Sequence, residues 1–231
     1  MADLSEFDIT KRWPAQNPDV IQLYSLPTPN GVKASIMLEE TGLAYEAHKI
    51  SFATDDQMTP EFLSLNPNNK IPAIIDPSGP GGAPIGIWES GAILIHLADK
   101  AGMLLPTDPV KRIEVLQWLM FQIGGVGPMF GQFGHFHKFA ADKVSGPYPT
   151  ERYLGETKRL LGVLDKHLAD KDYVAGEYSI ADIAIFPWLN VLNTFYEAGD
   201  VTDFESHTNL RAYLDRCLER PAVQLGLKIP A

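Results

Sequence analysis

The sequence predicts two domains, an α/β domain followed by an all-α domain. Short apolar strands alternate with helical patterns from residue 20 to 102, and strand signals vanish after residue 108. The chain has 231 residues, which suits one large domain or two small ones at roughly 100–200 residues per domain. Its composition, 45% hydrophobic and 21% charged, is that of a globular protein. We therefore expect an N-terminal extension over 1–19, an α/β domain over 20–103 and a helical domain over 109–231.

The first half of the α/β domain is predicted to be β-α-β. An apolar run over 20–24 indicates a strand, and the turn formers of 25–31 follow it. Apolar residues then recur at helical spacing from Val32, and Gly42 stands where a glycine would end that helix. A weaker strand pattern covers 45–52.

The second half is predicted to be α-β-β-α. Thr59 and Pro60 suit the N-cap and first residue of a short helix. Strands over 71–75 and 85–88 flank a Pro/Gly turn and are therefore predicted to be antiparallel. The first two strands need a helical crossover, so we expect them to be parallel. A last helix covers 90–100, with Ser90 as its N-cap.

The helical domain has its own start and stop signals. A long helix opens at Asp108 and Pro109, and a Gly-rich break is predicted over 124–128. Ser179 and Asp182 form a capping box pattern, which we interpret as structural rather than chemical. The helix that follows is apolar on nearly all faces over 180–192 and is predicted to be the centre of the bundle.

Charge and composition exclude several classes of partner. The net charge of −10 disfavours nucleic acid, whose phosphates an acidic protein repels. Cys217 is the only cysteine, so neither an internal disulfide nor a four-cysteine metal site is expected, and a reducing compartment fits. His135 and His137 have no obvious third ligand, so we expect no metal. The acidic N-terminus does not resemble a signal peptide, and no run of about 18 apolar residues occurs. We therefore expect a cytoplasmic protein without a membrane partner.

Three short segments carry the signals for chemistry, and all fall where a strand gives way to a helix. The loop 28–31 offers Thr28, Asn30 and a helix N-terminus to an anion, although an ordinary turn and N-cap would give the same pattern. In a second segment, Pro72 opens a strand. A cis peptide there would expose the Ile71 backbone to an extended ligand, whereas base rates favour a trans proline at a strand edge.

The third segment is Glu89-Ser90, at the start of a helix. Ser90 is either a plain N-cap or a donor to a carboxylate, while Glu89 would take an ammonium. Together the two would clamp an α-amino acid. Elsewhere the plain alternatives are that Arg152 pairs with Glu156 on its own helix and that Cys217 is a small buried hydrophobe.

Three of these motifs together resemble the glutathione transferase superfamily over about residues 20–225: Asn66–Ile74 (NPNNKIPAI), Trp88–Ile93 (WESGAI) and Tyr178–Ala184 (YSIADIA). Four further segments are most similar to its nu-class branch, whose members reduce disulfides with glutathione: Pro27–Gly31, Pro60–Leu63, Gln117–Leu119 and Gly124–Met129. The resemblance implies a thioredoxin-like N-terminal domain, a homodimer and glutathione as co-substrate.

The resemblance also implies roles for matching positions. Ile71, before a cis Pro72, would bind the cysteinyl backbone of glutathione, and Glu89 and Ser90 would hold its γ-glutamyl end. The remaining assignments are Lys70 and Gln57 near the glycine end, Arg152 reaching glutathione from the helical domain, and Thr28 and Asn30 beside the thiol.

One departure from the family pattern shapes the expected mechanism. Many transferases place a tyrosine, serine or cysteine beside the sulfur. Here Tyr24 falls inside a strand, and Asn30 stands where serine or cysteine is expected. Asparagine can donate or accept hydrogen bonds but cannot form a mixed disulfide. We therefore expect glutathione-dependent disulfide reduction in which glutathione itself attacks. The alternatives are conjugation of electrophiles and a non-catalytic glutathione-binding regulator.

Overall fold

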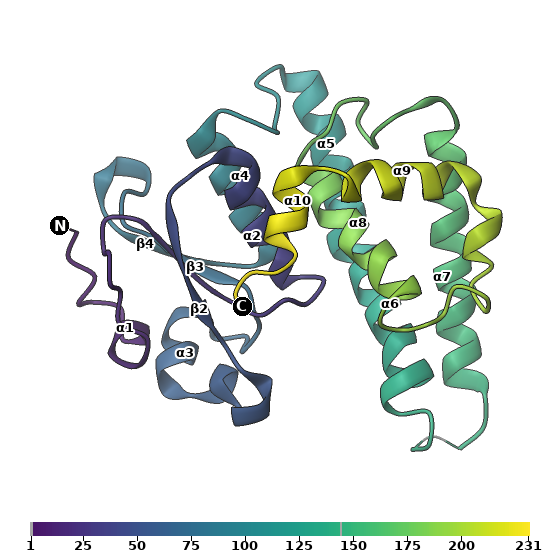
Figure 1. Cartoon of the computed structure of the whole chain (residues 1–231), viewed down its shortest axis with the longest axis horizontal. Coiled ribbons are helices and arrows are strands. Elements are labelled where there is room, and N and C mark those ends of the chain that lie inside the picture. The colour runs from purple at the N-terminus through teal and green to yellow at the C-terminus, as the bar shows by residue number, and fades with distance from the viewer. Residues whose placement is uncertain (1, 144) are drawn as a thin grey trace. The chain divides into compact units, whose positions relative to one another are not determined.

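The computed structural model describes residues 2–143 and 145–231, which form two compact units (Figure 1). The first unit runs to Met103 and also contains the segment Pro221–Ala231, and the second is Leu104–Arg220. The sequence pattern placed 221–231 with the helical domain, but the structure places it on the α/β unit. The Ser35 hydroxyl donates to the Gly226 carbonyl at 2.7 Å, and a Cβ at Gly226 would lie 2.6 Å from the Ile36 backbone. This close approach explains a glycine at that position.

The α/β unit follows the predicted order of elements. Its strands are β1 (Ile21–Ser25), β2 (Tyr45–Lys49), β3 (Ala73–Asp76) and β4 (Ile85–Trp88). Its helices are α1 (Ile9–Arg12), α2 (Gly31–Thr41), α3 (Pro60–Leu65), α4 (Ser90–Ala101) and α10 (Pro221–Gly226). The strands are ordered β2-β1-β3-β4, with β1 parallel to β2 and antiparallel to β3, and β3 antiparallel to β4. The predicted parallel and antiparallel pairs are thus confirmed, as is the thioredoxin-like arrangement.

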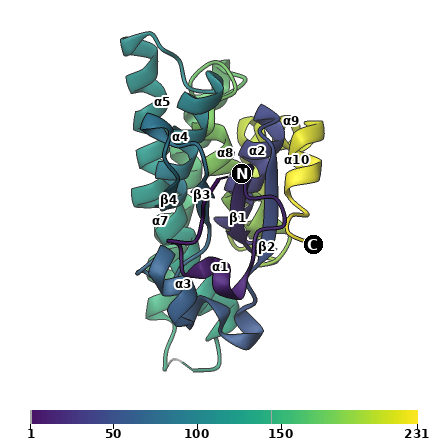
Figure 2. The same cartoon turned by 90° about the vertical axis from the view of Figure 1, so that its left-hand side faces the viewer.

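Helices cover both faces of this sheet. Figures 1 and 2 show α2, α4 and α10 on one side and α1 and α3 on the other. The alternation of side chains along β3 follows these layers, since Ala73 and Ile75 join the core beneath α1 and α3. Asp76 points the other way and accepts bonds from His96 at 2.7 Å and Lys100 at 3.0 Å on α4.

Local capping signals predicted the helix ends well. Gly42 and Gly102 adopt left-handed conformations, with φ of 67° and 66°, where α2 and α4 end. The Thr59 side chain accepts from the Phe62 amide at the start of α3, with Pro60 in the first turn. Ser90 differs, because it is the first residue of α4 and Glu89 occupies the N-cap position.

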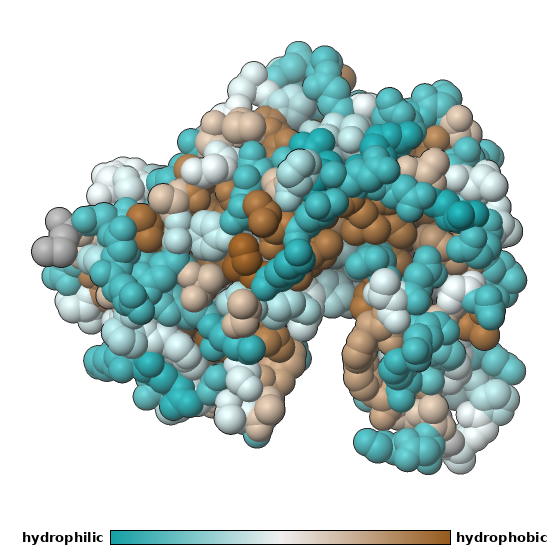
Figure 3. All heavy atoms as spheres, in the orientation of Figure 1, coloured by the Kyte–Doolittle hydropathy of each residue, from teal (hydrophilic) through white to brown (hydrophobic). Residues whose placement is uncertain are grey.

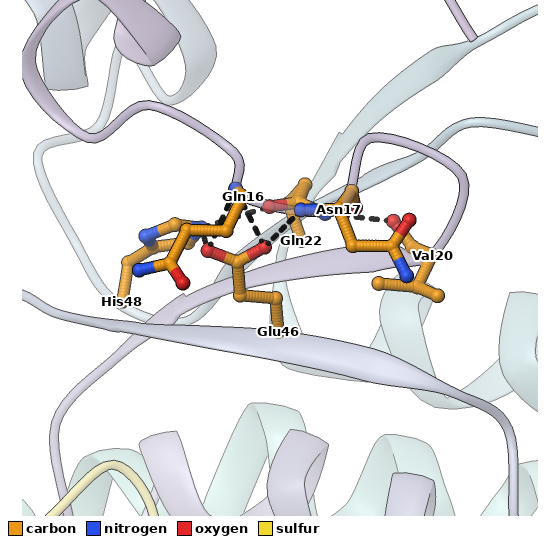
Figure 4. A network of polar contacts seen from close by, with 6 residues as sticks. All are labelled: Gln16, Asn17, Val20, Gln22, Glu46 and His48. Carbon is orange, nitrogen blue, oxygen red and sulfur yellow. Dashed lines mark hydrogen bonds and ion pairs between the residues drawn. The ribbon is translucent and has the colours of Figure 1, made fainter. Parts of the chain in front are cut away.

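The N-terminal segment is more ordered than the sequence pattern suggests. It contains α1, and Leu4 and Ile9 are buried in the core of the α/β unit. The Glu46 carboxylate on β2 accepts from the backbone amides of Gln16 and Asn17, both at 2.9 Å (Figure 4). These bonds are made to a strand about thirty residues away in the chain, so local periodicity carries no signal for them.

The second unit is built from helices throughout its described residues: α5 (Pro109–Phe121), α6 (Gly127–Gly134), α7 (Tyr148–His167), α8 (Ile180–Asn193) and α9 (Thr208–Leu218). The helix predicted to be central, α8, is buried over nearly its whole length. The capping box before it is confirmed, because Asp182 accepts from the Ser179 amide at 2.9 Å and Ser179 accepts from the Ala181 amide at 3.3 Å. Burial raises the pKa of Asp182 to about 6.

Two sequence expectations in this unit are corrected. The glycine-rich stretch after α5 does not break the helix. It forms a π-helical turn over Gln122–Val126 that joins α5 to α6. Glu156 binds Arg159, at 2.7 and 2.9 Å, rather than the expected Arg152. Arg152 and Arg159 both lie within one turn of Glu156, at i, i+4 and i, i+3 spacing, and the hydrogen bonds go to Arg159.

The last helix of the unit, α9, is amphipathic. Its inner stripe buries Leu210, Tyr213, Leu214 and Cys217, while the face turned to the viewer in Figure 3 is largely hydrophilic. Cys217 is thus the small buried hydrophobe that the sequence suggested. Within residues 2–143 and 145–231, no helix has the length and apolar character needed to cross a bilayer.

Candidate functional site

The three segments singled out in the sequence meet at one end of the sheet. The register places Tyr24 of β1 opposite Ala73 of β3, and Ala73 opposite Trp88 of β4. Three chain segments therefore lie at the same end of the strands: the one that follows Tyr24, the one that precedes Ala73 and the one that follows Trp88. This is the geometric reason why three sequence-distant turns can build one site.

The first of these turns positions Asn30 at the start of α2. The capping bond here comes from Thr28, whose hydroxyl oxygen accepts from the Gly31 amide at 3.2 Å. A Cβ at Gly31 would lie only 1.9 Å from the Leu26 carbonyl, so the tight turn requires glycine. Asn30 is one of the residues that line the cavity described below.

The second turn is shaped by Asn66, the first residue of the NPNNKIPAI motif. Its side-chain amide donates to the Lys70 carbonyl at 2.6 Å, and its carbonyl oxygen accepts from the Asn68 amide at 2.9 Å. The Asn66 side chain is buried. These bonds hold the loop that presents Lys70 and Ile71, and the peptide bond between Ile71 and Pro72 is cis.

The third turn has an unusual backbone. Glu89 adopts φ 72° and ψ 115°, in a region that residues other than glycine rarely occupy. Strain of this kind clusters at binding and catalytic sites, where surrounding structure maintains it. Glu89 is exposed here, whereas Ser90, the next residue, is buried at the N-terminal end of α4.

Together these turns enclose a cavity of about 240 Å³. Its lining includes five of the residues predicted from sequence: Asn30, Lys70, Ile71, Glu89 and Ser90. Asn66, Asn68 and Pro72 complete it. The lining joins amide donors, an ammonium and a carboxylate, and the N-terminal ends of α2 and α4 add partial positive charge. Such a cavity suits a small, polar ligand that carries both carboxylate and ammonium groups.

The remaining predicted site residues do not line this cavity. Thr28 caps α2, as described. Gln57 lies in the 3-10 turn Asp56–Met58, and its side-chain oxygen is buried without a partner among the described residues. Arg152 lies on α7 in the second unit. The predicted roles of these three residues toward a ligand stay predictions.

One residue next to the site was not predicted from the sequence. Lys33 on α2 is fully buried, and its Nζ donates to the Ser90 hydroxyl oxygen at 3.3 Å. Burial lowers the pKa of Lys33 to about 7, against a smaller opposing effect from the charge of Glu89. A charged residue type in an otherwise apolar helical stripe was the available signal, because lysine is almost never fully buried unless it is paired.

A larger pocket of about 310 Å³ occurs in the second unit, but the charged side chains that line it already form ion pairs with neighbouring residues. Its charged side chains pair locally, Arg216 with Asp172 at 3.0 Å and Lys171 with Asp170 at 2.6 Å. His135 and His137 are not part of it. Among the described residues there is no group of three or more side chains able to hold a metal ion.

Comparison with known proteins identifies the family. Residues 19–99 match the glutathione S-transferase N-terminal domain, and residues 150–221 match the glutathione S-transferase C-terminal domain. The two matches together cover more than half of the chain. The chain belongs to the glutathione S-transferase family. All three turns of the site lie within the N-terminal match.

Three relatives match this chain over nearly its whole length. Disulfide-bond oxidoreductase YfcG of Escherichia coli K12 is 49% identical over 210 residues, which are 90% of this chain and 94% of YfcG. A glutathione transferase from Pseudomonas putida, solved with one glutathione disulfide per subunit, is 61% identical with a TM-score of 0.98, covering 99% of this chain and 100% of that one. One from Burkholderia graminis, solved with two glutathione molecules per subunit, is 59% identical with a TM-score of 0.98, covering 100% and 96%. The nu-class resemblance is thereby confirmed.

Proposed function

We propose that this protein is a glutathione-dependent disulfide-bond oxidoreductase. The observation that carries the proposal is the cavity at one end of the strands, which Asn30, Ile71 and Ser90 line together. Similarity to YfcG supports the reaction type, and the glutathione and glutathione disulfide held by two close structural relatives support the ligand.

Each end of glutathione has a matching group in the cavity. Glu89 takes the γ-glutamyl ammonium, and Ser90, at the start of α4, takes the adjacent carboxylate. Ile71 pairs its backbone with the cysteinyl residue, because proline at the next position turns the chain away from the regular ladder. Lys70 lies toward the glycine carboxylate. The cysteinyl sulfur then faces Asn30 at the N-terminal end of α2.

The chemistry uses two glutathione molecules. Hydrogen bonds from Asn30 and Thr28, with the partial charge of the α2 N-terminus, favour the thiolate over the thiol. The bound thiolate attacks one sulfur of the substrate disulfide, forming a mixed disulfide and releasing the other sulfur as a thiolate that takes up a proton. A second glutathione thiolate attacks the glutathione sulfur of the mixed disulfide, giving glutathione disulfide and the second substrate thiol. Two glutathiones are oxidised and one substrate disulfide is reduced.

Two assays separate this activity from the alternatives. Consumption of glutathione with hydroxyethyl disulfide should greatly exceed conjugation to an aryl halide, because Asn30 supplies a donor rather than a base. Rapid conjugation with negligible disulfide reduction would indicate an electrophile transferase. Glutathione binding without either activity would indicate a regulatory protein.

Binding at Ser90 has a direct test. Loss of one charge-assisted hydrogen bond typically costs about 1.5–3 kcal/mol, so Ser90→Ala should weaken glutathione binding by roughly tenfold or more. Isothermal calorimetry measures this change. Ser78→Ala is a matched control in the same unit, because Ser78 does not line the cavity. An unaltered dissociation constant for Ser90→Ala would remove Ser90 from the site.

The proposed assembly is a homodimer that acts in the cytoplasm. The aromatic and methionine residues of 120–139 are of the kind enriched at interfaces, and Met120 and Phe139 are exposed in the chain by itself. A buried, unbridged Cys217 is compatible with a reducing compartment. Sedimentation at micromolar concentration should give the mass of two chains, and a monomer there would exclude this assembly.

A further inference from the structure

Lys33 stands out because a lysine is rarely buried completely, and this one contacts a residue that lines the cavity. The side chain is fully buried on α2, a helix that packs against α4. Transferring an ammonium from water into a protein interior is unfavourable unless its donors are well used. One of the donors of Lys33 is used on Ser90, at the wall of the cavity.

The contact with Lys33 affects how the Ser90 hydroxyl can bond to a ligand. A hydroxyl has one proton to donate and two lone pairs that accept. The Lys33 Nζ donates to Ser90 Oγ at 3.3 Å from the buried side, so it occupies a lone pair there. Ser90 also lines the cavity, where Lys33 does not. The hydroxyl proton is therefore left to point away from the ammonium, toward the cavity.

We propose that Lys33 is a positioning residue for this site, which orients the Ser90 hydroxyl and adds positive charge behind it so that the cavity accepts the γ-glutamyl carboxylate. The inference rests on the proposed function, because it assumes that glutathione occupies the cavity. The lysine does not reach the ligand itself. It acts through Ser90.

The charges around Lys33 decide how binding responds to pH. Glu89 favours its ammonium form, and burial opposes it. Of the elements packed against α2, β1 contributes Tyr24, α4 carries His96, Asp99 and Lys100, and α10 has no titratable residue. Because burial lowers the pKa of Lys33 to about 7, the empty site loses this positive charge above neutral pH. A bound carboxylate favours the charged form, so ligand binding should take up a proton.

The test uses S-methylglutathione, whose sulfur carries no proton and so contributes none to the measurement. Calorimetry from pH 6 to 8.5, in buffers of different ionisation enthalpy, gives both the dissociation constant and the proton uptake. For the unaltered protein we expect proton uptake near pH 8 and affinity that falls above about pH 7, by up to tenfold per pH unit. Flat affinity with no proton uptake would overturn the inference without any variant.

Variants then identify the group. Lys33→Met should weaken binding at pH 6.5 by about tenfold and abolish the pH dependence. Combining it with Ser90→Ala should cost no more than Ser90→Ala alone, because the two residues act as one unit. Additive losses, or a Lys33→Met variant that binds as the unaltered protein does, would overturn the positioning role.

The control is Lys100→Met, which removes a lysine of the same unit whose partner is Asp76 rather than Ser90. It should leave the affinity for S-methylglutathione unchanged, and an equal loss there would overturn the assignment to Lys33. If the unaltered protein binds no S-methylglutathione, both the proposed function and this inference fail. If it binds but Lys33→Met behaves normally, only the inference fails.

Discussion

The phenol ring of Tyr24 stacks on the imidazole of His48, with ring centroids 4.7 Å apart and planes inclined by 15°. Trp13 contacts the same tyrosine edge-on at 6.4 Å. Tyr24 is fully buried among these rings, and burial raises the pKa of its phenol. It is therefore a core residue on the strand, not the group that activates a thiol.

Tyr24→Phe should accordingly leave disulfide reduction within about twofold of the unaltered protein. The Tyr24 hydroxyl is buried without a hydrogen-bond partner among the described residues, so its removal should be neutral or slightly stabilising. Steady-state kinetics and thermal unfolding check both statements. A dead but folded Tyr24→Phe variant would point to a tyrosine-type transferase.

Unlike Tyr24, Asn30 is expected to be important for activity. Asn30→Ala should lower kcat/KM for disulfide reduction by roughly tenfold to a thousandfold, the range for removing one preorganised donor. Asn30→Ser is the matched variant, because it restores a hydroxyl donor at the same helix N-terminus, and it should recover part of the loss. Full activity in Asn30→Ala would show that thiolate stabilisation comes from elsewhere in the loop.

Cys217 should be dispensable for the reaction. Its thiol is buried on the inner stripe of α9, and burial raises its pKa well above the ordinary value, so the reactive thiolate is disfavoured. Cys217→Ala should retain disulfide reductase activity, with a loss of thermal stability from the deleted sulfur. Inactivity in a folded Cys217→Ala protein would place a protein thiol in the chemistry and contradict the two-glutathione mechanism.

The lowered pKa of Lys33 also leads us to expect that the stability of the protein depends on pH. In the unfolded chain its pKa returns to about 10.5, whereas burial lowers it to about 7 in the folded protein. Between these values the unfolded state binds one more proton, so the free energy of unfolding rises with pH over this window. Below about pH 7 both states are charged and the full cost of burial is felt.

Lys33→Met removes this dependence. Relative to the unaltered protein, the variant should lose stability as pH rises from about 7 to 10, by an amount on the order of a few kcal/mol. Urea unfolding at several pH values measures the difference, with Lys100→Met as the comparison. A difference in the free energy of unfolding that stays constant with pH would mean that Lys33 does not lose its charge in the folded state.

Local signals in the sequence determined the elements and most of the site. The strand-to-helix turns at Asn30 and Glu89, the cap at Thr59 and the capping box at Ser179 are each recognised within a few residues. Each depends on hydrogen bonds or backbone angles close by in the chain. Because β3 is antiparallel to both β1 and β4, the three turns of the site meet at one end of these strands. Five predicted residues thus meet around one cavity.

Only the tertiary structure shows which residue lies behind that cavity and which long-range hydrogen bonds stabilise the α/β unit around it. Lys33 reaches Ser90 across 57 positions, and Ser35 reaches Gly226 across 191. Asn17 binds Glu46 from a segment with no periodicity of its own. Helical spacing can place such residues on a face, but it cannot name their partners, because burial and charge environment depend on chain segments that meet only on folding. For the same reason Lys33, although unusual as a charged residue in an apolar helical stripe, could not be placed behind Ser90 from the sequence.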